Sequence, residues 1–410
     1  MSFKSIPVLD LSLARNEDSK PVFLGSLRNA LLDVGFLYIK NTGIDDVLIQ
    51  DVIEQGKAFF DLPEDKKLEI QMKNVPSFLG IQMFLFDSLH SLPSSGYNKL
   101  GNEITALQTD WREQIDLSTS HPLPTSSSPL YHNLLSPNQW PDVEALPHFR
   151  STYESYIKQM SALSISFTSL IAEALHLPST AFDRFFDIDQ QHKLKIVKYP
   201  DTASLPSANQ TQGVGPHKDS MLTSYLLQVP PHTGLQAQNL NGSWIDCPPI
   251  PSTLVVAIGQ GLEALTHGVC KSTTHRVLSP QAGLGPRFSV PFFQGVSYDA
   301  TFESVDIPEQ ILAMRDQRLS ERGAQRVDNV EFTFTKGRFR HLGEATLFNR
   351  VRSHQDVGER WYPDLLKRVR DEQAEANKKK AGEGKKMVAR DEGQEQGMGV
   401  KETAEGITAH

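Results

Sequence analysis

Cysteine is nearly absent from this chain of 410 residues, with Cys247 and Cys270 as its only two. Two thiols this far apart provide neither a disulfide framework nor a cysteine-based zinc site, so a reducing cytosol fits best. Long apolar runs are missing too: no segment approaches the ~20 residues that a membrane span requires. Charged residues also interrupt the first twenty residues too early for a secretory signal. We therefore expect a cytoplasmic protein that does not contact membranes.

An excess of positive charge is also lacking, because 49 acidic residues outnumber 41 basic ones and give a formal net charge of −8. Such a surface does not attract a phosphate backbone, which argues against nucleic acid as a partner. Hydrophobic residues make up 39% of the chain, enough for a sizeable core. The length allows a single large β core wrapped in helices as readily as two domains, and we expect a globular monomer that acts on a small-molecule substrate.

The N-terminal half has a mixed pattern. Apolar residues at helical spacing predict a helix over 21–35, then a short strand over 36–41 and a second helix over 45–60. Between about Met72 and Pro141 the pattern weakens into Ser- and Pro-rich sequence, which we interpret as long loops covering a site. A long amphipathic helix follows from Val143 to His176 and would back a sheet.

From Lys193 to Tyr298 the hydrophobic period changes to two. Short β-rich runs are separated by Gly, Pro and Asn turns: KLKIVKY, LTSYLLQV, GLQAQ, SWIDC, TLVVAIG and RFSVPFF. The pair Asn241-Gly242 between two of these runs predicts a hairpin. Many short strands of this kind favour a sandwich or jelly roll over alternating βαβ units. The expected fold class is therefore a mainly β core with flanking helices.

The chain divides into five expected segments. They are an N-terminal helical and loop region (1–142), backing helices (143–190), a β core (191–298), a C-terminal helical segment (299–370) and a charged tail (371–410). The tail contains no aromatic residue and interleaves Lys runs with Glu and Gly, so burial cannot offset the entropy of ordering it. We expect a frayed helix and then disorder there.

Three residues of the β region have the chemistry of a metal site. His217 and Asp219 stand two apart in GPHKDS, and alternate side chains of an extended segment point the same way. His275, in KSTTHRV, is flanked by β-branched residues that favour a neighbouring strand. Two imidazoles and one carboxylate on one face leave open positions opposite, which is what iron(II) needs to bind an organic acid and oxygen.

An anion anchor follows in the next predicted strand. Arg287 and Ser289 lie two residues apart in RFSVPFF and thus on one face. An Arg guanidinium binds a carboxylate bidentately, and a neighbouring hydroxyl adds a hydrogen bond. This pair would hold the far carboxylate of a dicarboxylic co-substrate.

These motifs together resemble the isopenicillin N synthase-like branch of the iron(II)/2-oxoglutarate dioxygenases. The resemblance rests on KYP, GPHKDS, GLQAQ, KSTTHRV and RFSVPFF, and on IPVLDL and VGFLYIKNTGI near the N-terminus. It implies a double-stranded β-helix (a distorted jelly roll), Fe(2+), and 2-oxoglutarate and O2 as co-substrates. It also implies that Tyr199 hydrogen-bonds 2-oxoglutarate.

Other residues near these motifs have less definite roles. Lys218 replaces a frequent Thr between two ligands, and strand alternation predicts that it points away from the metal. Phe292 and Phe293 are candidates for a substrate cavity, but adjacent strand residues face opposite sides, so at least one is packing. Residues 110–112 could form part of a lid or anchor a loop through Trp111.

The sequence predicts an oxygenase that hydroxylates, desaturates or cyclises a small organic molecule, with succinate and CO2 as by-products. Relatives of this form often act on specialised metabolites, which is the substrate class we expect. Three alternatives stay open: an iron oxidase using O2 without 2-oxoglutarate, a β-helix binding module that has lost catalysis, and a zinc hydrolase. The zinc hydrolase would have no use for the Arg287 anchor.

Overall fold

The computed structural model describes residues 2–82, 104–105, 108–186, 190–205, 211–301, 303–322 and 339–375. Its α-helices are α1 (Lys20–Asp33), α2 (Asp46–Phe60), α3 (Glu64–Leu68), α4 (Phe149–Ala174), α5 (Gln260–Leu265), α6 (Glu309–Arg322), α7 (Leu342–Ser353) and α8 (Gln355–Trp361). Its strands are β1 (Val8–Asp10), β2 (Phe36–Lys40), β3 (Gly80–Gln82), β4 (Ile104–Thr105), β5 (Gln108–Thr109), β6 (Glu113–Ser118), β7 (Lys193–Tyr199), β8 (Gln212–His217), β9 (Thr223–Gln228), β10 (Leu235–Gln238), β11 (Trp244–Asp246), β12 (Thr253–Ile258), β13 (His275–Leu278) and β14 (Arg287–Phe293). Short 3-10 helices are η1 (Leu11–Arg15), η2 (Met72–Asn74), η4 (Leu130–Leu134), η5 (Asp183–Phe185) and η6 (Thr202–Ser204).

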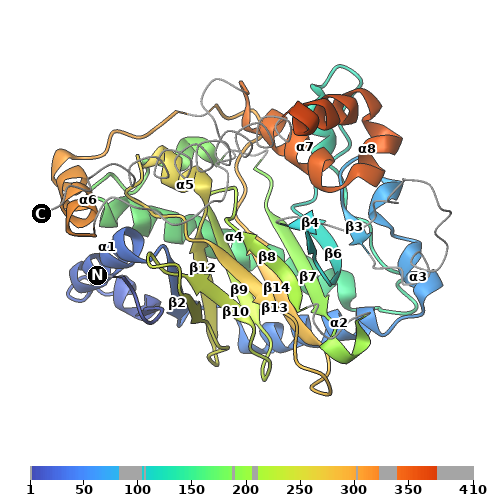
Figure 1. The fold of residues 1–410 in the computed structure, drawn as a ribbon, viewed down its shortest axis with the longest axis horizontal. Coiled ribbons are helices and arrows are strands. Elements are labelled where there is room, and N and C mark those ends of the chain that lie inside the picture. The colour runs from blue at the N-terminus through green and yellow to red at the C-terminus, as the bar shows by residue number, and fades with distance from the viewer. Residues whose placement is uncertain are drawn as a thin grey trace, which may run out of the picture.

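Two sheets form the core of the molecule (Figure 1). The larger has the order β1-β2-β12-β9-β14-β7-β6-β3, and the smaller has the order β11-β10-β13-β8. A buried cluster that includes Phe36, Val214, Ala237 and Val277 draws residues from both sheets. The predicted mainly β fold of jelly-roll type is confirmed, and so is the hairpin at Gly242, which joins the antiparallel strands β10 and β11.

Helices α1, α2 and α4 cover the outer face of the larger sheet (Figure 1). The Tyr153 hydroxyl on α4 donates to the Val52 carbonyl on α2 at 2.8 Å, which ties two of these helices together inside the core. The predicted helices and the strand near the N-terminus are confirmed as α1, β2 and α2. The long helix begins at Phe149 rather than at Val143, since Pro147 disfavours helical backbone in the residue before it.

The prediction that Met72–Pro141 forms only loops is wrong. Strand β6 pairs with β7, and β3 pairs with β6, so this region extends the larger sheet. Five of the six residues of β6 are buried, on both faces of the strand. Ile115 and Leu117 alternate with the polar residues Gln114, Asp116 and Ser118, but two apolar positions are too short a pattern to mark a strand within Ser- and Pro-rich sequence.

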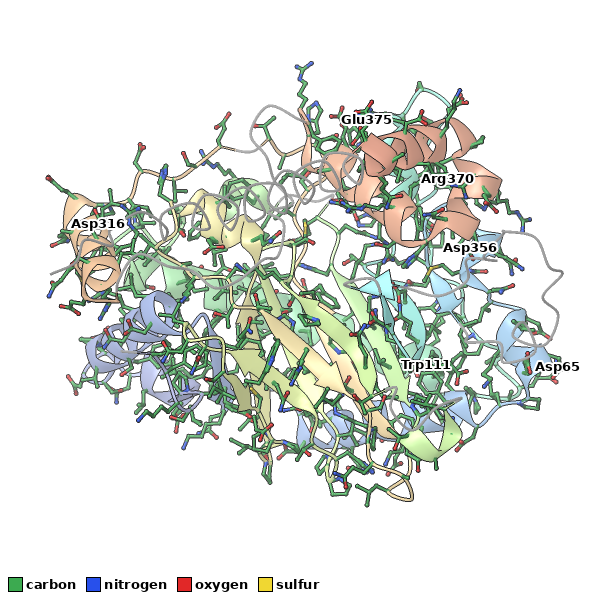
Figure 2. The ribbon with its side chains drawn as sticks, viewed as in Figure 1. Asp65, Trp111, Asp316, Asp356, Arg370 and Glu375 are labelled. Atoms are coloured by element: carbon green, nitrogen blue, oxygen red, sulfur yellow. The ribbon has the colours of Figure 1, made fainter. Side chains whose placement is uncertain are left out.

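The C-terminal helices pack beside β3 and β6 (Figure 1). The C-terminal segment 299–370 was predicted to be helical, and its described part contains α6, α7 and α8, with turns of the chain at His354 and again at Tyr362. Asp316 and Arg370 lie on peripheral helices (Figure 2). The predicted disordered tail lies mostly outside the described residues, of which 371–375 are helical. Among the helices that are described, we find none with the length and apolarity to cross a membrane.

Candidate metal centre

His217 and His275 lie side by side on neighbouring strands of the smaller sheet. They end β8 and begin β13, and the register of these antiparallel strands makes them direct partners. Their ring centroids lie 4.3 Å apart. The sequence predicted a partner strand for His275, and strand pairing provides it.

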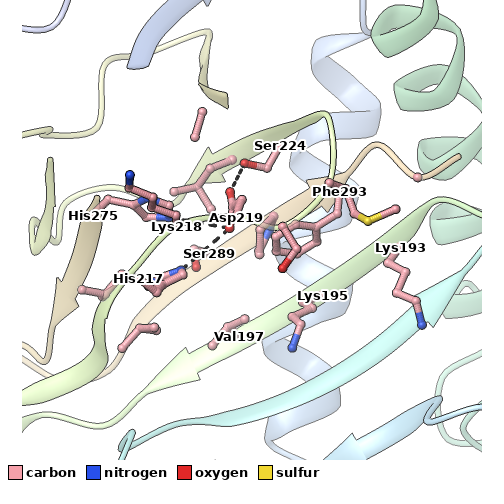
Figure 3. Close-up of a pocket in the computed structure, with 18 of the residues that line it drawn as sticks. Lys193, Lys195, Val197, His217, Lys218, Asp219, Ser224, His275, Ser289 and Phe293 are labelled. Atoms are coloured by element: carbon pink, nitrogen blue, oxygen red, sulfur yellow. Dashed lines mark hydrogen bonds and ion pairs between the residues drawn. The ribbon is translucent and has the colours of Figure 1, made fainter. Parts of the chain in front are cut away.

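Asp219 completes a cluster of three potential ligands (Figure 3). Its Oδ1 lies 3.8 Å from Nε2 of His217 and 3.8 Å from Nε2 of His275. One donor atom from each residue falls within 4.8 Å of the others. Two ligands each ~2.1 Å from one ion are at most ~4.2 Å apart, so both nitrogen–oxygen separations suit a shared metal.

Backbone carbonyls orient both imidazoles. Nδ1 of His217 lies 2.8 Å from the Gly215 carbonyl oxygen, and Nδ1 of His275 lies 3.1 Å from that of Thr273. A carbonyl only accepts, so each Nδ1 carries the proton and each Nε2 keeps a lone pair. Burial lowers the pKa of His275 to about 4, and the neighbouring His217 acts in the same direction. The ring is therefore neutral near pH 7, as a metal ligand must be.

Asp219 does not lie on the same strand as His217, contrary to the prediction, because β8 ends at His217. A loop places the carboxylate instead, and the Ser224 hydroxyl donates to its Oδ2, which leaves Oδ1 for a metal. This loop packs against the glycine-containing start of α5, where the Gln260 amide donates to the Asp219 carbonyl at 2.7 Å. A Cβ on Gly259 would lie 2.1 Å from the Met221 carbonyl oxygen.

Residues 110–112 anchor the strand that bears His217. The buried Asp110 carboxylate accepts from the Gly215 amide and from Nε2 of Gln212, each at 2.9 Å. The Trp111 amide donates to the Gln212 carbonyl at 3.0 Å, and the indole is buried. Figure 2 places Trp111 beside the sheets. These contacts favour the anchoring role of Trp111 over a lid.

Arg287 and Ser289 form a buried anion seat on β14. Both are 1% exposed, and Nε and Nη1 of Arg287 and Oγ of Ser289 have no hydrogen-bond partner among the described residues. Nη2 of Arg287 donates to Oε1 of Gln228 at 3.1 Å. Burial lowers the pKa of Arg287, whereas Tyr199 acts against that shift. Unpaired buried donors are costly, and a carboxylate would satisfy them. The donors present thus fit the far carboxylate of 2-oxoglutarate.

Tyr199 lies against this seat. The register pairs Tyr199 with Arg287 across β7 and β14, and the guanidinium carbon lies 5.1 Å from the centre of the phenol ring. Tyr199 and Ser289 line the neighbouring cavity, whereas Arg287 does not, so the guanidinium belongs to the wall behind them. A Cβ on Gly213 would lie 2.8 Å from the Tyr199 ring, so glycine gives the ring its room.

The metal cluster and Ser289 border one cavity of about 370 Å³, a size usual for a small-molecule site. Phe293 lines it, whereas Phe292 is fully buried in the core, so one of the two adjacent rings is packing, as predicted. Lys218, which was predicted to point away from the metal, is 8% exposed and lines the same cavity. Strand alternation ends at His217, so it does not decide the direction of this side chain.

Sequence reasoning missed a group of cations at another part of the cavity. Lys193 and Lys195 line it from β7, and Arg350 lines it from α7. The sequence did indicate the position of the two lysines, because Lys193 and Lys195 alternate with Tyr199 along KLKIVKY and therefore share its face of the strand. Arg350 had no such signal, since only the packing of α7 brings it here.

Two family models match the chain. Residues 6–143 match the N-terminal region described as non-haem dioxygenase in morphine synthesis, and residues 191–296 match the 2OG-Fe(II) oxygenase superfamily. The second match contains every ligand candidate and the anion seat.

Curated relatives agree with these matches. The chain is 62% identical to the 2-oxoglutarate-dependent dioxygenase frbJ of Dothideomycetidae sp. (strain 11243), over 92% of this chain and 97% of that one. It is 37% identical to a 2-oxoglutarate-dependent dioxygenase of Gibberella zeae, over 92% and 96%. A homoarginine-6-hydroxylase of Oryza sativa is 30% identical, over 74% and 89%.

Solved structures share the fold. A full-length Neurospora crassa protein in complex with alpha-KG and thymine superposes with a TM-score of 0.60 at 25% identity, covering 77% of this chain and 96% of that one. A rice dioxygenase for auxin oxidation superposes with a TM-score of 0.52 at 22% identity, covering 77% and 96%.

Proposed function

The chain belongs to the 2OG-Fe(II) oxygenase superfamily, and from that premise we propose that His217, Asp219 and His275 hold its iron(II). We assign Arg287, Ser289 and Tyr199 to the binding of 2-oxoglutarate. The reaction oxidises a small organic molecule with O2 and converts 2-oxoglutarate to succinate and CO2. One observation carries the assignment: a His-Asp-His cluster and a buried seat with unpaired donors adjoin a single cavity.

Each residue has a distinct part in this proposal. The bound iron(II) and 2-oxoglutarate supply the oxidising chemistry. The Gly215 and Thr273 carbonyls fix the two imidazole rings, so that both Nε2 lone pairs face Asp219. Arg287 and Ser289 fix the far end of the co-substrate, while the apolar cavity wall keeps water from the reacting atoms. The protein contributes position rather than acid–base catalysis.

Hydroxylation is the outcome we propose for a specialised metabolite, with desaturation or ring closure as variants of the same oxidation. Two of the similar proteins have names that state a small organic molecule: homoarginine in the rice hydroxylase and thymine in the Neurospora crassa complex. The ligand candidates and the anion seat all come from one chain, so a monomer suffices for the reaction. We also propose a cytoplasmic location.

The rival functions are weaker on specific grounds. An oxidase that uses O2 alone would leave the donors of Arg287 and Ser289 buried without a partner, at a cost to stability. A zinc hydrolase would have the same unused seat. A non-catalytic module would have no need for two imidazoles held in the metal-binding tautomer.

An anaerobic titration tests the proposal. Protein loaded with iron(II) should develop the weak visible absorption of a chelated keto acid when 2-oxoglutarate is added. Arg287→Ala should require ~10- to 100-fold more 2-oxoglutarate, because a charge-assisted bidentate contact worth ~1.5–3 kcal/mol is lost. Arg150→Ala, on the exposed face of α4, is the control and should titrate like the wild type. Iron-loaded protein that gives no such absorption would exclude 2-oxoglutarate as its co-substrate.

A further inference from the structure

Strand β7 spans the cavity from the 2-oxoglutarate seat to a group of cations (Figure 3). Tyr199, Val197, Lys195 and Lys193 line the cavity in alternation along this strand. Tyr199 pairs with Arg287 in the register, whereas Lys193 pairs with Phe293. Six residues of extended chain cover ~20 Å, so the cations at the far end of β7 are not part of the 2-oxoglutarate seat.

The far end of the cavity has more positive than negative charge. Asp116 on β6 lies directly opposite Lys195, and its Oδ2 lies 3.6 Å from Lys195 Nζ and 2.8 Å from Arg350 Nη2. Lys193 lies two register pairs further along, opposite Ser118. One carboxylate thus faces three cations in the described part of the chain.

Two nitrogen atoms of this group are buried and unpaired. Lys193 Nζ and Arg350 Nε have no hydrogen-bond partner among the residues that the structure describes. Burial lowers the pKa of Lys193 well below its usual range, and the charge of Arg350 acts in the same direction, while Asp116 opposes both. A buried cation without a partner is costly, and an anionic ligand would remove that cost.

The charges around the whole cavity also favour an anionic ligand. Within the described lining, Asp219 is the one acidic residue, and it belongs to the metal cluster. The basic lining residues are Arg112, Lys193, Lys195, Lys218 and Arg350. Apolar side chains also line the cavity, among them Phe293, Met221 and Pro291.

We propose that the substrate is an organic anion whose carboxylate or phosphate binds Lys193, Lys195 and Arg350 while its apolar body extends toward the metal cluster. This inference rests on the proposed function, since it names the substrate class of the same cavity. Lys193 and Arg350 are then specificity-determining residues: they complement an anion and repel a cationic end group.

Matched ligands of one shape test this assignment. Protein loaded anaerobically with iron(II) and saturating 2-oxoglutarate is titrated calorimetrically with phenylacetate, 3-phenylpropionate and 4-phenylbutyrate. Each acid is compared with its amide and its amine, and 2-phenylethyl phosphate is the phosphate arm. At least one acid or the phosphate should bind ten times more tightly than its neutral counterpart, and the amines should not bind. A tighter phosphate identifies the oxyanion as a phosphate, and a tighter acid identifies it as a carboxylate.

Two lysines of β7 provide variant and control. Lys193→Met keeps the stem and removes the buried unpaired charge, so the fold should tolerate it, and the ratio of acid to amide affinity should fall toward one. Lys198→Met removes a charge from the opposite face, where Nζ lies 5.8 Å from the centre of the Phe60 ring, and should leave the ratio unchanged.

Three results would overturn the inference: equal binding of acids, phosphate and amides, binding of the amines, or an unchanged ratio in Lys193→Met. Failure of the proposed function would be detected by a different measurement. The visible absorption with 2-oxoglutarate would then be missing from the wild type, whatever the ligand series showed.

Discussion

His192 illustrates how single buried residues set the pH range of this fold. The residue is 1% exposed, and its Nδ1 accepts from the Gly295 amide at 3.2 Å, directly before β7 begins. Burial lowers its pKa to about 4, with a smaller effect of His121 in the same direction. The folded protein thus holds the neutral ring, whereas the unfolded chain protonates near pH 6.5. The resulting stability is complete above pH 6.5 and is lost as the pH falls toward 4.

We predict that His192→Gln reduces the acid sensitivity of the fold. The Gln amide oxygen can accept from Gly295 but does not titrate. Between pH 7.5 and pH 5 the wild type should lose about 2 kcal/mol more unfolding free energy than the variant, measured by urea denaturation. Equal losses in the two proteins would show that His192 is not protonated on unfolding in this range.

The metal-ligand candidates could be read from the sequence because their chemistry lies in residue types at short spacing. GPHKDS, KSTTHRV and RFSVPFF each contain their functional residues within a few positions. The placement of Asp219 could not be predicted from the sequence, because it depends on a loop after β8 and on the Ser224 hydroxyl. The complete cation group could not be predicted from the sequence either, because strand pairing brings Asp116 to it and helix packing brings Arg350.

The loop from Asp219 to Met221 is the element on which the candidate metal centre depends most. It rests on the start of α5, where amides of Gly259 and Gly261 donate to carbonyls of residues 220–222. Gly259 has φ −87°, which any residue can adopt, so close approach rather than backbone conformation requires glycine there.

Gly259→Ala should displace this loop. Its Cβ would lie 2.1 Å from the Met221 carbonyl oxygen, so the backbone must shift, at a cost of ~1–3 kcal/mol in stability. We expect iron(II) to bind at least tenfold more weakly, measured by metal titration, because Asp219 moves with the loop. Gly25→Ala on α1 is the control, since nothing lies within 4 Å of its Cβ, and it should stabilise by ~0.5–1 kcal/mol. Unchanged iron affinity in Gly259→Ala would mean that this contact does not position the carboxylate.

Elements with a clear period were predicted, and elements without one were not. Amphipathic α1, α2 and α4 and the strands after Lys193 follow from their patterns. Strand β6 was missed because its alternating pattern rests on only two apolar residues, Ile115 and Leu117, and its pairing with β7 is a long-range contact that no local signal specifies. Residue 354 breaks the C-terminal helical segment at φ −127°, ψ 75°, without a proline or glycine to mark the break.

At the scale of the molecule, the cavity is a joint product of two sheets and a C-terminal helix. The smaller sheet supplies His217 and His275, the larger sheet supplies Tyr199 and Ser289, and α7 supplies Arg350. The metal cluster therefore comes from the smaller sheet, whereas the group of cations comes from the larger sheet and α7. Substrate choice can change through α7 without disturbing the metal cluster, as expected where function is placed on a shared scaffold.

The fate of 2-oxoglutarate in air tests the central claim most directly. Iron-loaded protein is incubated with 2-oxoglutarate and ascorbate, which supplies in place of a substrate the two electrons that the second oxygen atom requires. Succinate, CO2 and oxygen uptake are followed in the wild type and in Asp219→Ala. We predict that succinate and CO2 appear in equal amounts as 2-oxoglutarate disappears, and that Asp219→Ala falls to the rate of free iron because a ligand is lost. Oxygen uptake with 2-oxoglutarate unchanged, or undiminished succinate formation by Asp219→Ala, would contradict the account.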